Sequence, residues 1–384
     1  MRPSSLTRRA VFARAGGLAA AGVLAACSDA GGGGVPAPAT TPAPAATPDP
    51  DPDPGERRRV IVVGHRGASG YRPEHTQAAY ELAARMGVDA VDVDLVATRD
   101  GALVARHEPE IGGTTDVAAH PEFASRRRTG VVIDGKPTDG WFVSDFTLAE
   151  LKTLRCRERI PETRPHNTLY DGRYPVLTLD EVLDVLDRVS GELGRRVGVL
   201  PEVKHSTYHR QIGLPIEPTL VETLRRRGRD RDPSVIIQSF ETATLRELKG
   251  QLGCPLLQLI DSRGVAPADL TAVGDPRTFD DLVTPAGLRE VATYATWIGP
   301  SKERVVDGTT PTTLLADARA AGLRTMPYTF RNENEFLPAP LRAGGPAAPK
   351  DTYGGAFAEY AQVYGLGVEG LFSDNGDTAV AALA

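Results

Sequence analysis

Short apolar runs alternate along the chain with amphipathic segments. The runs are rich in Val, Ile and Leu and are bounded by turn residues, whereas the segments between them carry apolar residues at helical spacing. This alternation predicts βα units around a parallel sheet, and eight such strands predict a (β/α)8 barrel, a TIM barrel. The expected strands are 59–65, 90–96, 196–204, 234–240, 255–261, 294–300, 324–330 and 370–375, and the expected helices include 76–86, 178–190, 216–227, 241–252, 311–321 and 354–365.

One more apolar run, 102–108, does not fit the barrel pattern. It follows the second expected strand after only four residues, too few for a crossover to a parallel strand. The intervening Asp100–Gly101 is a hairpin signal, so we expect a β-hairpin after strand two. With these two residues as the loop, Asp94 faces His107 across the hairpin.

The segment 109–175 shows no clear strand and contains many turn-forming residues. A loop of this length inside a compact domain is usually functional or disordered. Its aromatic residues favour an inserted cap that packs over the barrel mouth; they are Phe123, Trp141, Phe142, Tyr170 and Tyr174.

The N-terminal segment 1–27 is typical of an export signal. Several arginines precede an apolar stretch at 15–26, which is too short to span a bilayer as a helix. The sequence "TRRAVF" resembles a twin-arginine signal, and "LAAC" resembles a lipobox that would make Cys27 a lipidated residue. The alternative is a plain secretory signal cleaved nearby. We expect an exported lipoprotein anchored in a membrane, on the periplasmic or cell-surface side.

Residues 28–56 are rich in Pro, Gly and Ala and have almost no apolar bulk. Such a composition cannot offset chain entropy by burial, so this segment is expected to be a disordered tether. The folded domain is then expected at 57–384, with 109–175 as its insertion. Two further cysteines, Cys156 and Cys254, are expected to be buried and unpaired rather than joined.

The net charge of the chain bears on its partners. It is −6 at pH 7, and the arginines are interspersed with acids rather than gathered in a stripe. Because phosphate backbones select basic surfaces, nucleic acid is not expected as a partner. The oligomeric state stays open.

Charged residues and histidines gather at the carboxyl ends of the expected strands, where barrel enzymes place their chemistry. His65 and Arg66 end strand one, and the acids at 92 and 94 share one face of strand two. Glu202 and Lys204 end the third barrel strand, and His107 returns through the hairpin.

Three carboxylates at one mouth repel one another, and a divalent cation would relieve that repulsion. An all-oxygen set formed by Asp92, Asp94 and Glu202 favours Ca²⁺ first and Mg²⁺ second over Zn²⁺. Arg66 and Lys204 add positive charge for an anion. Because two histidines remain for proton transfer, the set predicts phosphate ester chemistry. Each feature alone is common in structural roles; their consistent placement favours a site.

The stretch 64–111, which begins "GHRGASGYRPEHTQAAYELAARMG", resembles the signature of the glycerophosphodiester phosphodiesterase family. Four later stretches resemble further family motifs in the same order: "YPVLTLDEVLDVL" (174–186), "PEVK" (201–204), "QSF" (238–240) and "GLFSDN" (370–375). The resemblance covers residues 60–377, and the long 109–175 segment is similar to the insertion of the larger, exported branch.

The resemblance implies roles for these residues. His65 and His107 would form the general acid/base pair, and Arg66 and Lys204 would bind the phosphate. Asp92, Asp94 and Glu202 would coordinate the cation, with Glu74 in or near this shell. The implied reaction is hydrolysis of glycerophosphodiesters to sn-glycerol 3-phosphate and an alcohol.

The chain departs from the family pattern at three positions. Asp92 stands where the family has Glu, so the metal would sit closer or bind through a water. His75 replaces an Asn, and Glu108 replaces an Asp. Two other functions remain compatible with the residues: a phospholipase D-like enzyme acting on lysophospholipids or sphingomyelin, and a non-catalytic lipoprotein that binds glycerophosphodiesters.

Overall fold

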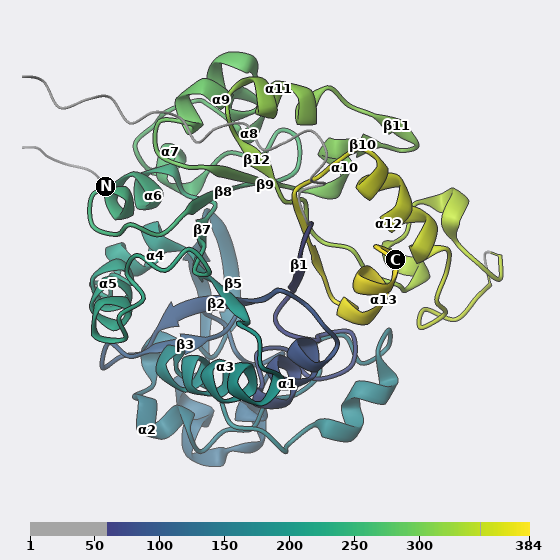
Figure 1. Ribbon diagram of the computed structural model, residues 1–384. Helices are drawn as coiled ribbons and strands as arrows, with labels where there is room; N and C mark the ends of the chain where they lie inside the picture. The colour runs from purple at the N-terminus through teal and green to yellow at the C-terminus, as the bar shows by residue number, and fades with distance from the viewer. Residues whose placement is uncertain (1–59, 346) are drawn as a thin grey trace, which may run out of the picture. The chain divides into compact units, whose positions relative to one another are not determined.

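A computed structural model describes residues 60–345 and 347–384, and within them the strands form a nearly closed barrel. Eight strands are parallel and follow the order β12-β9-β8-β7-β6-β2-β1-β13 (Figure 1). Hydrogen bonds from Phe372 N to Pro327 O (3.0 Å) and from Phe330 N to Phe372 O (2.9 Å) join the two ends of this order. The strands are β1 Ile61–Gly64, β2 Ala90–Ala97, β6 Gly198–Val203, β7 Ile237–Ser239, β8 Leu256–Ile260, β9 Trp297–Pro300, β12 Arg324–Thr325 and β13 Gly370–Ser373. The predicted (β/α)8 barrel is confirmed.

Helices surround the barrel and cover its apolar outer face (Figure 1). Val91, Val93 and Leu95 of β2 belong to the core between strands and helices, while the alternate aspartates of β2 face the interior. The expected helices are present as α1 Gln77–Arg85, α3 Leu179–Leu193, α5 Glu217–Arg226, α6 Thr242–Lys249, α11 Leu314–Ala320 and α12 Ala356–Gly365. None of the helices in the described residues is both long and apolar enough to cross a membrane.

Seven short helices were not predicted, because a helix of one or two turns shows little periodicity. They are α2 Leu148–Leu151, α4 Ser206–Gln211, α7 Ala268–Ala272, α8 Phe279–Leu282, α9 Pro285–Val291, α10 Lys302–Val305 and α13 Gly376–Ala381. A two-residue strand pair, β10 Val306–Asp307 and β11 Thr310–Pro311, lies between α10 and α11.

The hairpin after β2 is present, but its expected register was wrong by one residue. Strand β3 (Leu103–Ala105) pairs antiparallel with β2, with Leu95 opposite Ala105. The loop has three residues, 99–101, and it ends on Gly101 at φ +80°, a backbone conformation that glycine adopts without strain. Arg106 N therefore donates to Asp94 O (3.0 Å), and His107 lies one position beyond that pair.

The segment 109–175 contains an unexpected β-hairpin. Strands β4 (Arg128–Ile133) and β5 (Lys136–Gly140) are joined by a tight Asp134–Gly135 turn, in which both residues have positive φ. The hairpin was missed because β4 is mostly exposed and shows no sustained alternation. Short 3-10 helices make up much of the rest: η1 Val117–Ala119, η2 Pro121–Arg126, η3 Val143–Asp145 and η4 Pro165–Tyr170.

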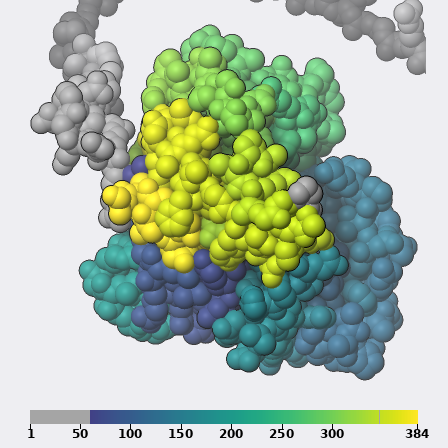
Figure 2. Space-filling model, turned by 90° about the vertical axis from the view of Figure 1, so that its right-hand side faces the viewer, coloured from purple at the N-terminus to yellow at the C-terminus, as the bar shows by residue number. Residues whose placement is uncertain are grey.

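The inserted segment packs a small core of its own beside the barrel. Phe123, Phe146, Leu151 and Leu154 are buried in it together with Val96 of β2, and Trp141 packs against it. The segment also touches the 331–345 stretch, where Thr163 donates to Glu335 at 2.6 Å. The space-filling view shows the teal and blue atoms of the insertion beside the yellow-green atoms of that stretch (Figure 2).

Two groups of expectations remain, one on the cysteines and one on the N-terminal segment. Cys156 and Cys254 are buried and form no disulfide, as expected. The export signal, Cys27 and the tether at 28–56 lie outside the described residues.

Candidate active site

The strand ends bring most of the predicted site residues into one cavity in the barrel mouth. His65 and Arg66 reach it from the end of β1, Glu202 and Lys204 from β6, and His107 from beyond β3. Asp92 lies deeper, and aromatic residues complete the walls. The full lining is His65, Arg66, Asp92, His107, Glu202, Lys204, Gln238, Phe240, Leu259, Tyr328, Thr329, Arg331 and Phe372.

Asp92, Asp94 and Glu202 form a buried carboxylate cluster. One oxygen from each lies within 4.8 Å of the others, and the β2–β6 register places Asp94 directly beside Glu202. Burial raises the pKa of Glu202 to about 8, in part against the attraction of Lys204. Burial, with the charges of Asp94 and Glu202, also raises the pKa of Asp92 well above its ordinary value. Crowded carboxylates with raised pKa values fit a divalent cation, and an all-oxygen set suits Ca²⁺ or Mg²⁺.

Neighbouring side chains fix the orientation of the two aspartates. Gln238 Nε2 donates to Asp92 Oδ1 (2.5 Å), and the backbone N of Arg66 donates to Asp92 Oδ2 (3.1 Å). His75 Nε2 hydrogen-bonds Asp94 Oδ2 at 2.8 Å. Although burial raises the pKa of Asp94, the charge of Lys204 and the nearby histidines outweigh it and hold that pKa well below its ordinary value. His75 thus has a definite task here, orienting a carboxylate of the cluster.

His65 is paired with a buried carboxylate from the neighbouring strand. Its Nδ1 lies 2.5 Å from Asp374 Oδ1, just beyond β13. Asp374 Oδ2 in turn accepts from Arg331 Nε (2.7 Å) and Arg164 NH2 (2.6 Å). Burial lowers the pKa of His65 to about 4, although Asp374 acts in the opposite direction. The ring is therefore neutral at pH 7, with Nε2 free of the Asp374 contact.

His107 is paired with the next residue in the chain. Its Nδ1 lies 2.5 Å from Glu108 Oε1, and its Nε2 lies 3.1 Å from Lys204 Nζ. Burial, followed by the charges of Arg66 and Lys204, lowers the pKa of His107 to about 3. The two histidines thus share one arrangement, with a carboxylate on Nδ1.

The two predicted phosphate-binding cations lie beside the carboxylate cluster. Lys204 Nζ is 2.8 Å from Glu202 Oε1. Arg66 NH1 donates to Glu74 Oε2 (3.0 Å), and its Nε lies 3.6 Å from Asp94 Oδ2. Glu74 binds Arg66 and lies outside the three-carboxylate cluster. Both cations line the cavity, so an anion there would meet two positive charges.

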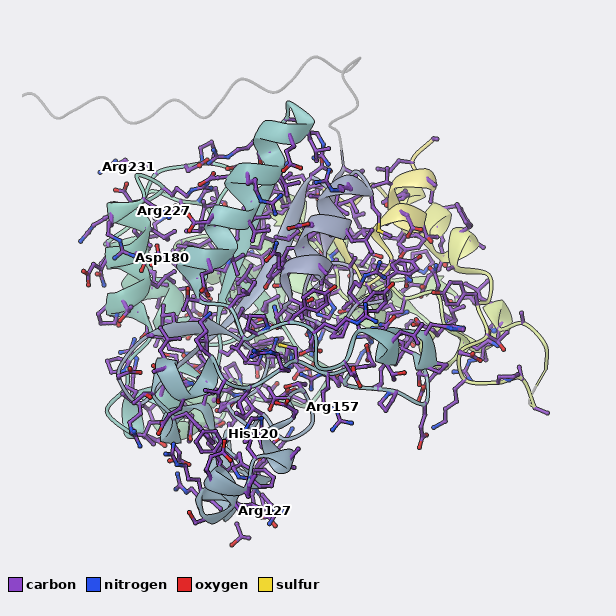
Figure 3. All side chains as sticks on the ribbon, turned by 90° about the horizontal axis from the view of Figure 1, so that it is seen from below. His120, Arg127, Arg157, Asp180, Arg227 and Arg231 are labelled. Atoms are coloured by element: carbon purple, nitrogen blue, oxygen red, sulfur yellow. The ribbon has the colours of Figure 1, made fainter. Side chains whose placement is uncertain are left out.

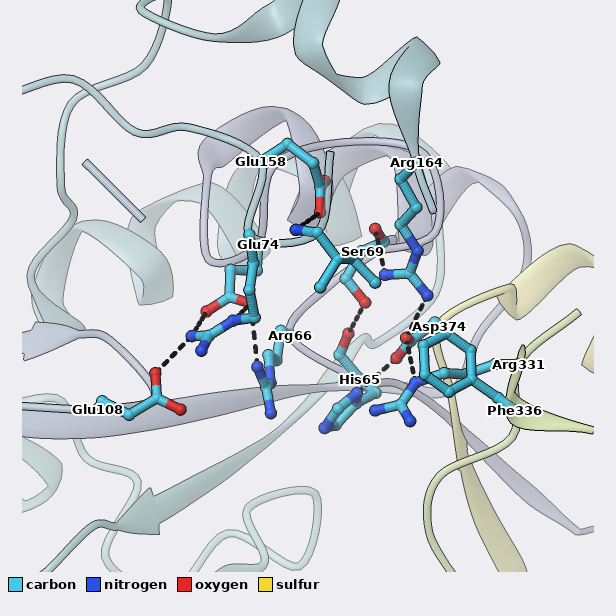
Figure 4. Close-up of a pocket in the computed structure, with 12 residues that line it drawn as sticks. His65, Arg66, Ser69, Glu74, Glu108, Glu158, Arg164, Arg331, Phe336 and Asp374 are labelled. Carbon is cyan, nitrogen blue, oxygen red and sulfur yellow. Dashed lines mark hydrogen bonds and ion pairs between the residues drawn. The ribbon is translucent and has the colours of Figure 1, made fainter. Parts of the chain in front are cut away.

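A second, outer cavity adjoins the first and shares His65, Arg66 and Arg331 with it. Figure 4 shows the two histidine-side carboxylates, Asp374 and Glu108, on opposite sides of this opening, each with an arginine against it. Only Ile160 and Phe336 are apolar among the lining residues, which are His65, Arg66, Ser69, Glu74, Glu108, Glu158, Arg159, Ile160, Arg164, Arg331, Phe336 and Asp374.

Comparison with known proteins assigns the family. The model of the glycerophosphoryl diester phosphodiesterase family matches residues 65–378. Glycerophosphodiester phosphodiesterase GDPD6 of Arabidopsis thaliana is 33% identical over 81% of this chain and 82% of its own length. The glycerophosphodiester phosphodiesterase of Haemophilus influenzae is 28% identical over 83% and 88%. The chain belongs to the glycerophosphoryl diester phosphodiesterase family. Its prediction as an enzyme of this class is confirmed.

Solved structures show the same fold at low identity. A putative glycerophosphoryl diester phosphodiesterase from Silicibacter pomeroyi superimposes with a TM-score of 0.60 at 21% identity, covering 86% of this chain and 95% of that one. An Oleispira antarctica phosphodiesterase, solved with its product sn-glycerol-3-phosphate, superimposes with a TM-score of 0.54 at 19% identity, covering 84% and 96%.

Several site residues of this family member were not predicted. Asp374 and Gln238 lie in stretches that the resemblance marked. Asp374 directly follows β13, so the strand-end rule could have found it, whereas Gln238 is the middle residue of β7. Arg159, Arg164 and Arg331 lie in irregular segments, where sequence spacing gives no signal about which side chain reaches the cavity.

Proposed function

We propose that the cavity hydrolyses glycerophosphodiesters to sn-glycerol 3-phosphate and an alcohol, with a divalent cation and histidine acid/base catalysis. The observation that carries this proposal is the pairing of two histidines with carboxylates beside a buried three-carboxylate cluster. The family membership and the product bound to the Oleispira antarctica relative support the same reaction.

The chain's own side chains account for substrate binding and proton transfer. Arg66 and Lys204 bind the phosphate oxygens and orient the diester. Asp374 and Glu108 hold Nδ1 of their histidines, which directs Nε2 of His65 toward the cavity. One histidine accepts the proton of the nucleophile on its Nε2, and the other, which must enter the step as an imidazolium, gives its Nε2 proton to the alkoxide as the bond to phosphorus breaks. The nucleophile is water or, by way of a cyclic phosphate, the neighbouring glycerol hydroxyl.

Asp92, Asp94 and Glu202 would hold the cation, for which Ca²⁺ is proposed first and Mg²⁺ second. Bound there, it supplies Lewis-acid stabilisation of charge on the phosphoryl oxygens. Asp92 is shorter than the Glu of the family pattern, and its two oxygens accept hydrogen bonds from Gln238 and the Arg66 backbone, which would orient it for the cation.

The outer cavity favours a small polar alcohol over an acyl chain. Its walls are polar or charged apart from Ile160 and Phe336, and burying a lipid tail against such groups would cost free energy. Glycerophosphodiesters with hydrophilic head groups are therefore preferred here over lysophospholipids.

We also propose that the protein is exported and anchored to a membrane through a lipid on Cys27. The arginines, apolar stretch and "LAAC" of residues 1–27 support this location. Replacing Cys27 by Ser should move the protein from the membrane to the soluble fraction. Equal membrane retention of the variant would contradict the anchor.

The first test is release of sn-glycerol 3-phosphate from glycerophosphocholine by the purified protein. EDTA should abolish release, and Ca²⁺ should restore it better than Mg²⁺. The matched variant Glu202→Gln keeps the side-chain shape but removes a proposed ligand charge, so it should need more cation for half-maximal activity. Full activity in EDTA would contradict metal dependence, and no release with either cation from folded protein would contradict the reaction itself.

A further inference from the structure

Two arginines of the inserted segment reach the active site from outside the barrel. Arg159 and Arg164 lie in one short stretch between α2 and η4, and both line the outer cavity. Both side chains contact residues that are far from them in the sequence, so the insertion connects separate loops of the barrel rim.

Arg159 joins the supports of His107 and Arg66. Its NH2 lies 2.6 Å from Glu108 Oε2, and the same carboxylate binds His107 through Oε1. Its Nε and NH2 also donate to Glu74 Oε2 (2.7 Å) and Oε1 (2.6 Å), and Glu74 binds Arg66. One planar guanidinium therefore fixes two carboxylates, one behind a histidine and one behind a phosphate-binding cation.

Arg164 supports His65 in the same manner. Its NH2 donates to Asp374 Oδ2 (2.6 Å), and Asp374 Oδ1 binds His65. Its Nε donates to Glu333 Oε1 (2.7 Å) and its NH1 to Ser69 O (2.9 Å). Because the side chain is buried, this ion pair is protected from solvent screening.

We propose that Arg159 and Arg164 are positioning residues, one for each active-site histidine, so that the insertion sets the geometry of both proton-transfer groups. This inference rests on the proposed function of the histidines. Each unit is a His–carboxylate–Arg chain: His107–Glu108–Arg159 and His65–Asp374–Arg164. The guanidinium keeps its carboxylate ionised and aimed at Nδ1, which fixes each ring so that Nε2 of His65 faces the cavity and Nε2 of His107 faces Lys204.

The charge state of the carboxylates agrees with this arrangement. Although burial raises the pKa of Glu108, the hydrogen bond and charge of His107 and the charge of Arg159 lower it below its ordinary value. Burial likewise raises the pKa of Asp374, and the charges of Arg331, Arg164 and His65 outweigh that effect. Both carboxylates are thus ionised at neutral pH and accept a hydrogen bond from Nδ1 of their histidines.

Arg159→Ala is the first variant to test, because this side chain is partly exposed and its loss should not unfold the barrel. We expect kcat to fall about 10-fold, the lower end of the usual loss when an outer-shell partner is removed, with KM changed by less than about threefold. Arg157→Ala is the matched control: Arg157 lies on the same stretch, is 53% exposed, and points away from the ribbon (Figure 3). Its kcat should equal that of the wild type.

A double-mutant cycle shows whether Arg159 acts through the histidine. If it does, Arg159→Ala and Glu108→Gln together should lose little more kcat than the worse single variant. If the two losses in kcat multiply, the proposal is wrong. It is also wrong if Arg159→Ala changes only KM or keeps kcat within twofold of the wild type. Wild-type turnover is the reference in every comparison, so an inactive wild type contradicts the proposed function instead.

Arg164 needs a conservative variant, because Arg164→Ala leaves two buried carboxylates without their partner. Arg164→Lys keeps the charge but cannot reach Glu333, Ser69 and Asp374 together. We expect a fall in kcat with an unchanged melting temperature, and the double variant with Asp374→Asn should lose little more kcat than Asp374→Asn alone. A stable Arg164→Lys variant with full activity would overturn the role of Arg164, and so would a loss in kcat that multiplies with that of Asp374→Asn.

Discussion

The two proposed acid/base histidines each pair with a carboxylate, but the two His–carboxylate units are built differently. His65 and Asp374 follow β1 and β13, which are hydrogen-bonded neighbours with Gly64 opposite Ser373. Their side chains are 13% and 3% exposed. His107 and Glu108 follow the short β3 and are adjacent in the chain, with side chains 26% and 35% exposed.

The difference shows two ways of placing a catalytic group. The His65 unit is fixed by the register of two barrel strands, so the packed core that sets the barrel also sets this pair. The His107 unit lies on a hairpin and depends on side-chain contacts to Lys204 and to Arg159 of the insertion. We therefore expect the His107 unit to tolerate small changes in its carboxylate better than the His65 unit.

Removing either imidazole should give the largest loss. We expect His65→Ala and His107→Ala each to lower kcat about 10³-fold, within the usual contribution of general acid/base groups. Circular dichroism should show that both variants fold. Turnover of either variant within a few-fold of the wild type, measured by release of sn-glycerol 3-phosphate, would contradict the assignment of that histidine.

Neutralising the partner carboxylate should lower kcat more in the His65 unit than in the His107 unit. Asp374→Asn should lower kcat at least about 10²-fold, because an amide allows the wrong tautomer and leaves Arg164 and Arg331 facing a neutral group. Glu108→Gln should cost only about 10-fold, since Glu108 is more exposed and solvent can replace part of its interaction. Steady-state kinetics of both variants checks the order, and a larger loss for Glu108→Gln would reverse the comparison.

Residues at the ends of barrel strands could be predicted from the sequence better than residues held by the hairpin and the insertion. The apolar runs located all eight barrel strands, and the rule that chemistry lies at strand ends then found His65, Arg66, Glu202 and Lys204. Asp92 and Asp94 followed from the period of a strand. His107 depended on the Asp-Gly hairpin, where the element was right and the register was wrong by one residue.

The two arginines of the insertion that contact the site could not be predicted from the sequence, for a physical reason. Arg159 and Arg164 lie in irregular backbone whose path depends on packing of the insertion, and many other arginines of the chain make ordinary surface ion pairs. Only the folded chain distinguishes Arg159, which contacts two active-site carboxylates, from Arg157, which contacts Asp171 at 3.7 Å.

Acidification should have the smallest effect. It should lower the free energy of unfolding, over a pH range that differs between the two histidines. Burial lowers the pKa of His65 to about 4 and that of His107 to about 3, whereas an unfolded histidine titrates near about 6.5. Below that value the unfolded chain binds protons that the folded chain does not, so the free energy of unfolding falls as the pH falls. Each histidine should account for about 2 kcal/mol of the loss between pH 7 and pH 5.

Urea unfolding of chelator-treated protein measures this contribution. His65→Gln and His107→Gln should each make stability less dependent on pH between 7 and 5, by similar amounts. Between pH 4 and pH 3 the effect should be smaller for His65→Gln than for His107→Gln, because folded His65 takes up most of its own proton in that range. Equal behaviour of the two variants below pH 4 would show that the strand-held and hairpin-held histidines are desolvated to the same degree.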